Sequence, residues 1–266
     1  MAALSANQIK FIRSLAQKKF RQESGLFIAE GEKIVAEALQ SNFKVRDVYR
    51  VEEIGEECMG RISCLASPSP VLAVIEQKKD SSNRTEEICK RIFSLMSSDS
   101  QSGCAAVDLH SMVSNNRVPL CLALDGVRDP GNLGTILRLA DWFGIDAVFA
   151  SEDTVELYNP KVVQATMGAI FRKEVAYGNL SGVIKRFSAA GLPVYGTFLN
   201  GRSIYSQNIE HKGVIVMGSE SFGISKENEQ LITHKLLIPP YPIDSQTSES
   251  LNVAIATAVI CAEFRR

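Results

Sequence analysis

Three glycine-rich or polar loops in this 266-residue chain carry residue types that could do chemistry. The first is Asp129-Pro130-Gly131-Asn132-Leu133-Gly134, which Arg138 follows. The second runs from Gly218 through Glu220 to Gly223, and the third leads through a proline-rich stretch to Ser250-Leu251-Asn252. Glycines let the backbone approach a ligand closely, and an arginine can bind phosphate or stabilise a developing negative charge.

Phosphate binding in the manner of two well-known loops is excluded. Gly126 and Gly131 have the G-x-x-x-x-G spacing of a P-loop, but Asn132 and Leu133 stand where a lysine and a hydroxyl residue are required. Gly131 and Gly134 supply only G-x-x-G, so the dinucleotide pattern G-x-G-x-x-G is absent too.

Each polar residue also has an ordinary structural interpretation, which the sequence leaves open. Asn132 and Ser250 could cap helices, Arg138 could be a solvated helix residue, and the Glu220 loop could be a surface turn. Asn252 is predicted inside the first turn of a helix, where asparagine is a mediocre helix former and is expected to make a specific bond.

Strands and helices alternate from Val118 onward, which predicts an α/β fold with an open parallel sheet. Near-continuous apolar runs indicate buried strands at 120–125, 145–150, 192–198, 213–218 and 235–240. Helices are predicted at 133–143, 160–171, 179–190, 224–233 and 251–264. Ligands of such sheets bind beyond the carboxyl ends of the strands. The site is therefore expected in the loops after Asp125, Phe198, Met217 and Ile238.

The chain divides into three parts that differ in residue composition and in predicted secondary structure. Residues 1–77 predict a small α+β domain, with a helix over Ile9–Leu15 capped by Ser5, a second helix after Gly31, and strands at 27–28, 45–51 and 71–75. Residues 78–117 are polar and serine-rich and predict a linker with some helix. Residues 118–266 form the α/β domain.

The net charge of −1, from 29 basic and 30 acidic residues, neither indicates nor excludes a nucleic-acid partner. Residues 1–50 are different: nine Lys or Arg against five Asp or Glu form either a local phosphate-binding surface or a solvated helix face. No apolar run is long enough to span a membrane, and the N-terminus lacks a secretory signal, so a cytoplasmic protein without membrane contact is expected. The six cysteines form no C-x-x-C pair, and we expect reduced thiols and no metal site.

The three loops, in this order, resemble the three motifs of the SpoU (TrmH-type) family of RNA ribose 2′-O-methyltransferases. The patterns are D-P-G-N-x-G-x-x-x-R, G-x-E-x-x-G and S-L-N-V, and the resemblance covers about residues 120–266. Residues 165–175 also look like the family's segment between the first two motifs. Lys18–Leu39 is similar to the small L30-like RNA-binding domain of many members.

The resemblance implies a C-terminal deep trefoil knot, a homodimer and S-adenosylmethionine as the cofactor. The implied cofactor-binding residues are Thr197, Leu199, Gly218, Glu220, Gly223, Ile238, Leu251 and Asn252. The chain departs from the family after Pro239, where a longer stretch without glycine replaces a short glycine-containing turn.

The resemblance also implies a catalytic set consisting of Arg138, Asn132, Glu220, Ser250 and Asn252. A guanidinium stays protonated at ordinary pH, so we expect Arg138 to bind the neighbouring phosphate and stabilise the 2′-oxygen rather than act as a base. RNA contacts are expected at Lys18, Lys19, Arg21 and Lys33, with rRNA favoured over tRNA as the substrate.

Two other functions are compatible with parts of the sequence. A catalytically inactive RNA-binding protein on the same scaffold is disfavoured because the motif residues are intact. A nucleotide-binding α/β enzyme of unrelated chemistry is disfavoured because both phosphate-binding patterns fail.

Overall fold

The computed structural model describes residues 4–78, 83–97, 118–242 and 250–266. The chain separates into two compact units, each of which is described by itself. The first unit comprises Met1–Asp80, Arg128–Asp141 and Val155–Lys173. The second unit comprises Ser81–Val127, Trp142–Thr154 and Glu174–Arg266.

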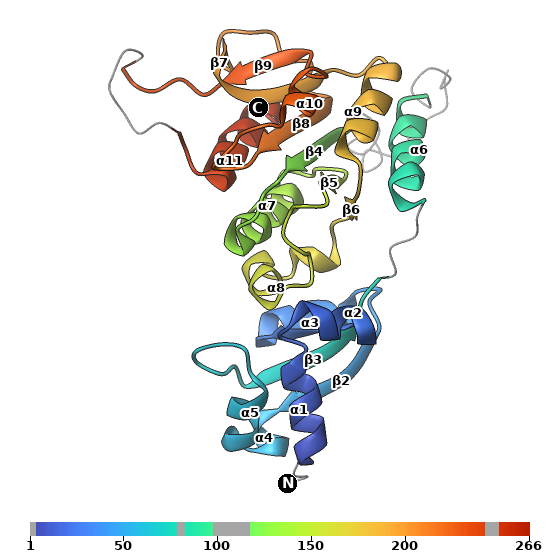
Figure 1. Ribbon diagram of the computed structural model, residues 1–266, viewed down its shortest axis with the longest axis vertical. Helices are drawn as coiled ribbons and strands as arrows, with labels where there is room; N and C mark the ends of the chain where they lie inside the picture. The colour runs from blue at the N-terminus through green and yellow to red at the C-terminus, as the bar shows by residue number, and fades with distance from the viewer. Residues whose placement is uncertain (1–3, 79–82, 98–117, 243–249) are drawn as a thin grey trace, which may run out of the picture. The chain divides into compact units, whose positions relative to one another are not determined.

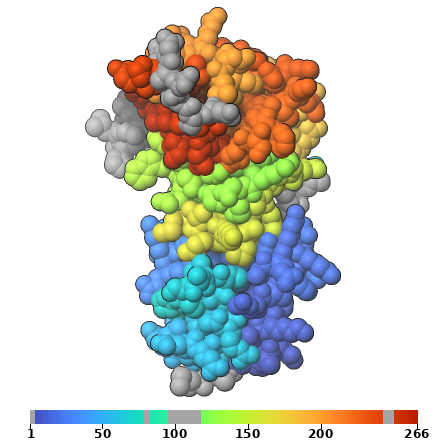
Figure 2. Space-filling model, turned by 60° about the vertical axis from the view of Figure 1, so that its left-hand side comes forward, coloured from blue at the N-terminus to red at the C-terminus, as the bar shows by residue number. Residues whose placement is uncertain are grey.

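The first unit contains an antiparallel sheet in the order β1-β3-β2, formed by β1 (Leu26–Glu30), β2 (Val45–Arg50) and β3 (Val71–Glu76) (Figure 1). Its helices are α1 (Ala6–Ser14), α2 (Lys18–Ser24), α3 (Glu32–Gln40), α4 (Val51–Ile54) and α5 (Glu56–Ile62). The predicted strands are confirmed, and Ser5 caps α1 in a capping box with Gln8. Helices α1 and α5 pack side by side, and Figure 2 shows the dark-blue N-terminal surface against the lighter blue of the following helices.

Two further helices of this unit, α7 (Pro130–Trp142) and α8 (Pro160–Thr166), pack closely because Gly134 lacks a side chain. A Cβ at Gly134 would lie 2.3 Å from the Ala165 Cβ. The Asp129 carboxylate accepts a hydrogen bond from the Asn132 N–H at 2.8 Å, so Asp129, not Asn132, caps α7.

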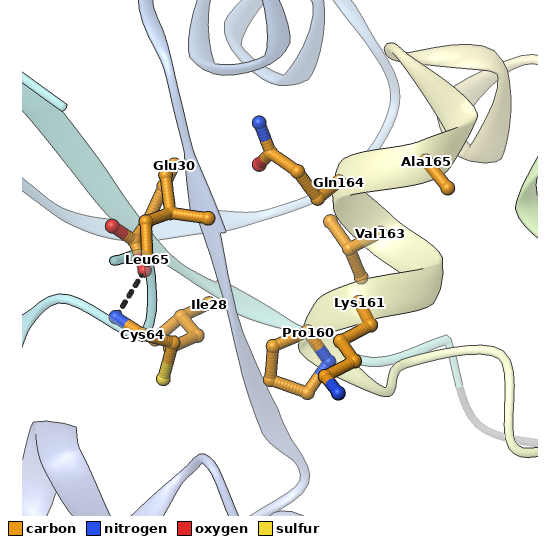
Figure 3. A pocket seen from close by; sticks show the side chains of 9 residues that line it. All are labelled: Ile28, Glu30, Cys64, Leu65, Pro160, Lys161, Val163, Gln164 and Ala165. Atoms are coloured by element: carbon orange, nitrogen blue, oxygen red, sulfur yellow. Dashed lines mark hydrogen bonds between the residues drawn. The ribbon is translucent and has the colours of Figure 1, made fainter. Parts of the chain in front are cut away.

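A pocket of about 260 Å³ lies in the same unit between β1 and α8 (Figure 3). Its buried carboxylate, Glu30, is fully engaged. It accepts bonds from the Ser63 hydroxyl and the Cys64 N–H, both at 2.6 Å. Glu30 therefore stabilises the loop after α5, and its carboxylate is not presented to a ligand.

The second unit is built on a six-stranded sheet in the order β6-β5-β4-β8-β7-β9, with every neighbouring pair parallel (Figure 1). The strands are β4 (Leu120–Asp125), β5 (Val148–Ala150), β6 (Val175–Tyr177), β7 (Val194–Ser203), β8 (Gly213–Gly218) and β9 (His234–Leu237). The helices α9 (Leu180–Ala189), α10 (Lys226–Glu229) and α11 (Val253–Phe264) follow strands, as predicted. The parallel α/β sheet is confirmed. The short strand β6 was missed, and α10 spans only part of the helix expected at 224–233.

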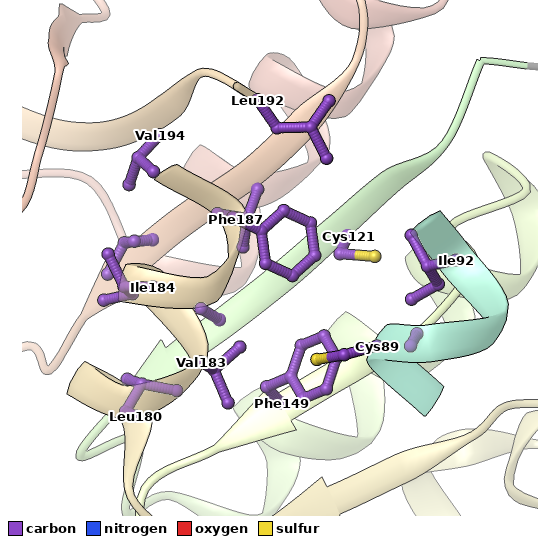
Figure 4. Packing of buried hydrophobic residues seen from close by; sticks show 14 of the residues in the cluster. Cys89, Ile92, Cys121, Phe149, Leu180, Val183, Ile184, Phe187, Leu192 and Val194 are labelled. Carbon is purple, nitrogen blue, oxygen red and sulfur yellow. The ribbon is translucent and has the colours of Figure 1, made fainter. Parts of the chain in front are cut away.

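Helix α6 (Arg84–Ser97) lies inside the segment predicted as a linker, yet it belongs to the core of the second unit. Ile88, Cys89 and Ile92 are buried in a cluster with Phe149 and Phe187 (Figure 4). The helix expected within this segment is therefore confirmed, but its assignment to a linker is wrong, because an amphipathic helix gains stability by burying its apolar face in a core. Residues 79–82 and 98–117 lie outside the described part of the chain, and the predicted domain boundaries stay predictions.

The described cysteines are free thiols, and three of them are buried. Burial raises the pKa of the Cys261 thiol to about 12 and that of Cys121 well above its ordinary value. These thiols are therefore packing residues at neutral pH. Within the described ranges, no group of three or more His, Cys, Asp or Glu side chains could hold a metal ion.

Candidate active site

A pocket of about 650 Å³ lies beyond the carboxyl ends of β7, β8 and β9, all within the second unit. This is where ligands bind in open parallel sheets. It is lined by eight residues that the sequence predicted for the site: Thr197, Leu199, Gly218, Glu220, Gly223, Ile238, Ser250 and Leu251.

The first wall of the pocket is a bulge in β7. Thr197 and Arg202 both pair with Leu236 of β9, so the residues between them do not pair with β9 and bulge out of the sheet. Phe198, Leu199 and Asn200 then line the pocket. A Cβ at position 201 would lie 2.6 Å from the Leu236 carbonyl carbon, so glycine is needed for the strand to rejoin β9.

The second wall is a closed turn after β8. Ser219 and Gly223 exchange backbone hydrogen bonds of 3.0 and 2.9 Å, and the Ser219 hydroxyl accepts a third from the Phe222 N–H at 3.1 Å. A Cβ at Gly218 would lie 2.2 Å from the Gly223 carbonyl carbon. The turn therefore folds back on its own strand end and presents a fixed backbone surface to the pocket.

Asp125, at the end of β4, anchors this turn from the neighbouring strand. It pairs in register with Gly218, and its buried carboxylate accepts bonds from the Ser225 N–H at 2.8 Å and the Asn228 amide at 2.9 Å. The Asn228 carbonyl oxygen in turn accepts a bond from the Ser181 hydroxyl at 2.8 Å. The sequence motifs did not predict this network. A carboxylate that ends an apolar strand was the available signal, because a buried charge requires partners.

We expect Asp125→Ala to lower the free energy of unfolding by about 2 kcal/mol, because the buried Asn228 amide and the partly buried Ser225 N–H lose their acceptor. It should also weaken binding of the pocket ligand about tenfold by loosening the turn. Chemical denaturation and calorimetry measure the two effects. Asp125→Asn keeps one acceptor oxygen and serves as the control. An alanine variant with wild-type affinity would show that the network does not position the turn.

Apolar surface and carboxylates share the pocket. Leu199, Met217, Ile224, Leu236 and Leu251 supply the apolar part. Of the lining carboxylates, Glu229 is neutralised by Lys235, whose Nζ lies 2.5 Å from its Oε1 and 4.4 Å from the centre of the Phe198 ring. Glu220 is exposed. The pocket therefore combines an apolar surface, which suits a ring system, with the carboxylate of Glu220 among its lining groups.

The remaining predicted catalytic residues lie outside the pocket lining. Arg138 is exposed on α7, which also carries Asn132 and belongs to the first unit. Asn252 caps α11, where its side-chain oxygen accepts bonds from Ala254 N–H at 2.9 Å and Ile255 N–H at 3.3 Å. Its predicted position inside the first turn is therefore wrong. The capping role left open for Ser250 belongs to Asn252.

Comparison with known protein families decides the identity of this fold. The model of the SpoU rRNA Methylase family matches residues 119–262, more than half of the chain. The chain belongs to this family. A second model, the MRM3-like substrate binding domain, matches residues 6–93 of this SpoU family protein.

Relatives of this SpoU family protein match over nearly its whole length. The 23S rRNA (guanosine(2553)-2′-O)-methyltransferase RlmP of Bacillus subtilis (strain 168) is 27% identical, over 97% of this chain and 96% of its own. Among solved structures, a putative RNA methyltransferase of the TrmH family from Porphyromonas gingivalis is 35% identical with a TM-score of 0.77, covering 99% of both chains. An AdoMet-bound rRNA methyltransferase from Sinorhizobium meliloti is 30% identical with a TM-score of 0.77, covering 100% of this chain and 96% of its own.

One predicted RNA contact in this SpoU family protein must be corrected. Lys18, Lys19 and Lys33 are exposed, but Arg21 is 1% exposed. Its guanidinium pairs with Glu156 at 2.5 Å and donates to the carbonyl oxygens of Leu15 and Ala16, both at 2.8 Å. A side chain buried with its donors engaged cannot also bind a surface phosphate, so Arg21 is a structural residue.

Arg21→Ala should therefore destabilise the first unit rather than merely weaken RNA binding. We expect a loss of about 3 kcal/mol in the free energy of unfolding, because Glu156 and two carbonyl groups lose their partner. Lys18→Ala is the matched control on the same helix and should change stability by less than about 0.5 kcal/mol. Denaturant titration of both variants checks this. If Arg21→Ala and Lys18→Ala had the same free energy of unfolding, Arg21 would not be a structural residue and could again be counted among the RNA contacts.

Proposed function

We propose that this protein transfers the methyl group of S-adenosylmethionine to a ribose 2′-hydroxyl of RNA. The observation that carries the proposal is the pocket beyond β7, β8 and β9, which gathers the second-motif turn and the start of the third motif in a chain of the SpoU family. The Bacillus subtilis relative is a 23S rRNA 2′-O-methyltransferase, which favours rRNA over tRNA as the substrate.

The pocket residues fit this cofactor. Its apolar side chains suit the adenine ring, and the backbone of the Ser219–Gly223 turn offers polar groups at a fixed distance because Gly218 leaves no room for a side chain. Glu220 supplies negative charge for the α-ammonium or sulfonium group. When bound, S-adenosylmethionine supplies an activated methyl group for in-line displacement.

Arg138 is proposed as the group that makes the 2′-oxygen reactive. Its exposed guanidinium can bind the neighbouring RNA phosphate and stabilise negative charge on the 2′-oxygen while the proton leaves to phosphate or water. Asn132, Glu220, Ser250 and Asn252 are proposed to fix the arginine, the ribose and the loops. Asn252 does so through the start of α11, which it caps.

The assembly proposed for this activity follows the family. Residues 1–77 bind the substrate RNA through Lys18, Lys19 and Lys33. Residues 118–266, with α6 packed in the same core, carry methyl transfer on a trefoil-knotted C-terminal segment. Two copies form a homodimer that completes the site. The longer loop expected at residues 239–249 includes 243–249, which lie outside the described residues.

The proposed location is the cytoplasm, where rRNA is accessible. No described helix of the chain has the length and apolar character that crossing a membrane requires.

Methyl incorporation from labelled S-adenosylmethionine into total RNA tests the activity, and mapping 2′-O-methyl sites in cells with and without the protein identifies the nucleotide. Loss of one mapped ribose methylation supports the proposal. Binding of RNA and cofactor without incorporation into any RNA would instead identify the inactive RNA-binding protein.

A further inference from the structure

We propose that a basic groove in the first unit holds a single-stranded segment of the substrate RNA, with one base stacked on Phe20. The groove lies between α1, α2 and the end of α5 and has a volume of about 790 Å³. Its polar and aromatic lining consists of Lys10, Arg13, Ser14, Gln17, Phe20 and Arg61, and we call it the α1–α5 groove. The proposal rests on the proposed function and gives its substrate a location.

Charge makes the groove a phosphate-binding surface. Lys10, Arg13 and Arg61 line it, and no carboxylate does. Within the described part of the chain, none of these three cations forms an ion pair with a carboxylate. Unneutralised cations along one groove attract a phosphate backbone and release its counterions on binding.

Arg13 is already held in place for this role. Its Nη1 donates to the carbonyl oxygen of Ser63 at 3.0 Å and, more weakly, to that of Arg61 at 3.4 Å. The guanidinium therefore spans from α1 to the end of α5, and among the described residues its Nε and Nη2 groups keep their hydrogens for an acceptor from outside. A preorganised guanidinium loses less side-chain entropy when it binds a phosphate.

Phe20 gives the groove an aromatic surface. Phe20 is 36% exposed on α2, and its ring lines the groove beside the three cations. Lys19 lies 6.0 Å from the ring centre, so Phe20 belongs to the same basic surface as the predicted contacts Lys18 and Lys19. Cations beside an exposed aromatic ring are the usual surface for unpaired bases, because a base stacks on the ring while its phosphates meet the cations.

A single strand fits these features better than a duplex. The bases of a duplex are stacked on each other and cannot reach Phe20 without unpairing. Gln17 and the Ser14 hydroxyl, which donates to the Phe11 carbonyl oxygen at 2.6 Å, add hydrogen-bonding groups at the groove for a base edge or a 2′-hydroxyl. The groove thus recognises a loop or splayed region of RNA.

The test compares binding of a labelled single-stranded RNA oligonucleotide and its duplex by the full-length protein. The double variant Lys10→Ala, Arg61→Ala should weaken single-strand binding about tenfold at low salt and reduce the salt slope by about 1.4, at about 0.7 for each phosphate that is no longer neutralised. Phe20→Ala should weaken it about five- to tenfold without changing the salt slope, and should affect the duplex little. The matched control is Lys185→Ala, Arg186→Ala, which removes the same amount of charge from two exposed cations of α9.

The outcomes separate this proposal from the methyltransferase proposal. Thermal unfolding and S-adenosylmethionine affinity should be unchanged in all three variants, which shows that they fold. If the double variant binds RNA with wild-type affinity and salt slope, the proposed RNA-binding role of the groove is wrong, even if the wild-type protein methylates RNA. Equal losses of RNA affinity in the groove and control variants, or tighter binding of the duplex than of the single strand, would also contradict it. If the wild-type protein never transfers methyl groups but the groove variants lose RNA affinity as expected, the groove proposal stands and the methyltransferase proposal is rejected.

Discussion

Replacing Arg138 by alanine should lower the rate of methyl transfer by more than about a thousandfold and leave the affinity for S-adenosylmethionine within a few-fold of wild type. The side chain is exposed on α7 and does not line the cofactor pocket. Loss of one donor that stabilises a developing oxyanion costs about 100- to 1000-fold. In its proposed role the arginine also holds the RNA phosphate, so its loss should misplace the ribose and lower the rate further.

Two further variants define what Arg138 does. Arg138→Lys keeps the positive charge but loses the planar pair of donors, so we expect activity between those of wild type and alanine. Arg186→Ala removes another exposed arginine and should leave turnover unchanged. Single-turnover methyl transfer and calorimetry give the rate and the affinity. An alanine variant that retains most of its turnover would remove Arg138 from the mechanism.

Gly218→Ala should weaken S-adenosylmethionine binding about a hundredfold. The added Cβ would lie 2.2 Å from the Gly223 carbonyl carbon, 2.3 Å from the Ile224 nitrogen and 2.5 Å from the Gly223 oxygen. All three are backbone atoms, so the turn itself must move by about an ångström. That movement disturbs the wall of the pocket and should also lower the free energy of unfolding by about 1–3 kcal/mol.

Gly223→Ala is the matched control, because it adds the same methyl group at the other end of the same turn. Nothing lies within 4 Å of its added Cβ, and only its φ of +66° opposes a side chain. We expect a cost of about 1 kcal/mol in stability and a few-fold change in affinity. Calorimetry and denaturation on both variants distinguish crowding from backbone strain. Equal effects of the two substitutions would refute crowding as the cause.

The residue pattern alone predicted five of the six strands of the parallel sheet and the loops that line the pocket. An apolar run such as Leu120–Asp125 can be buried on both faces only in a covered parallel sheet, and loops after such strands meet at one edge. That geometry follows from chain direction alone. The motif patterns then led to the family, and eight of the predicted residues line the pocket.

The burial of polar side chains, and the groups that they bond, could be seen only in the folded chain. Arg21 looks like a surface cation in sequence, yet it is buried by pairing with Glu156, 135 residues away. Asp125 meets its partners Ser225 and Asn228 only because β4 and β8 are neighbours in the sheet. Local patterns report which faces are apolar, whereas the partner of a buried charge is set by packing between segments distant in the chain.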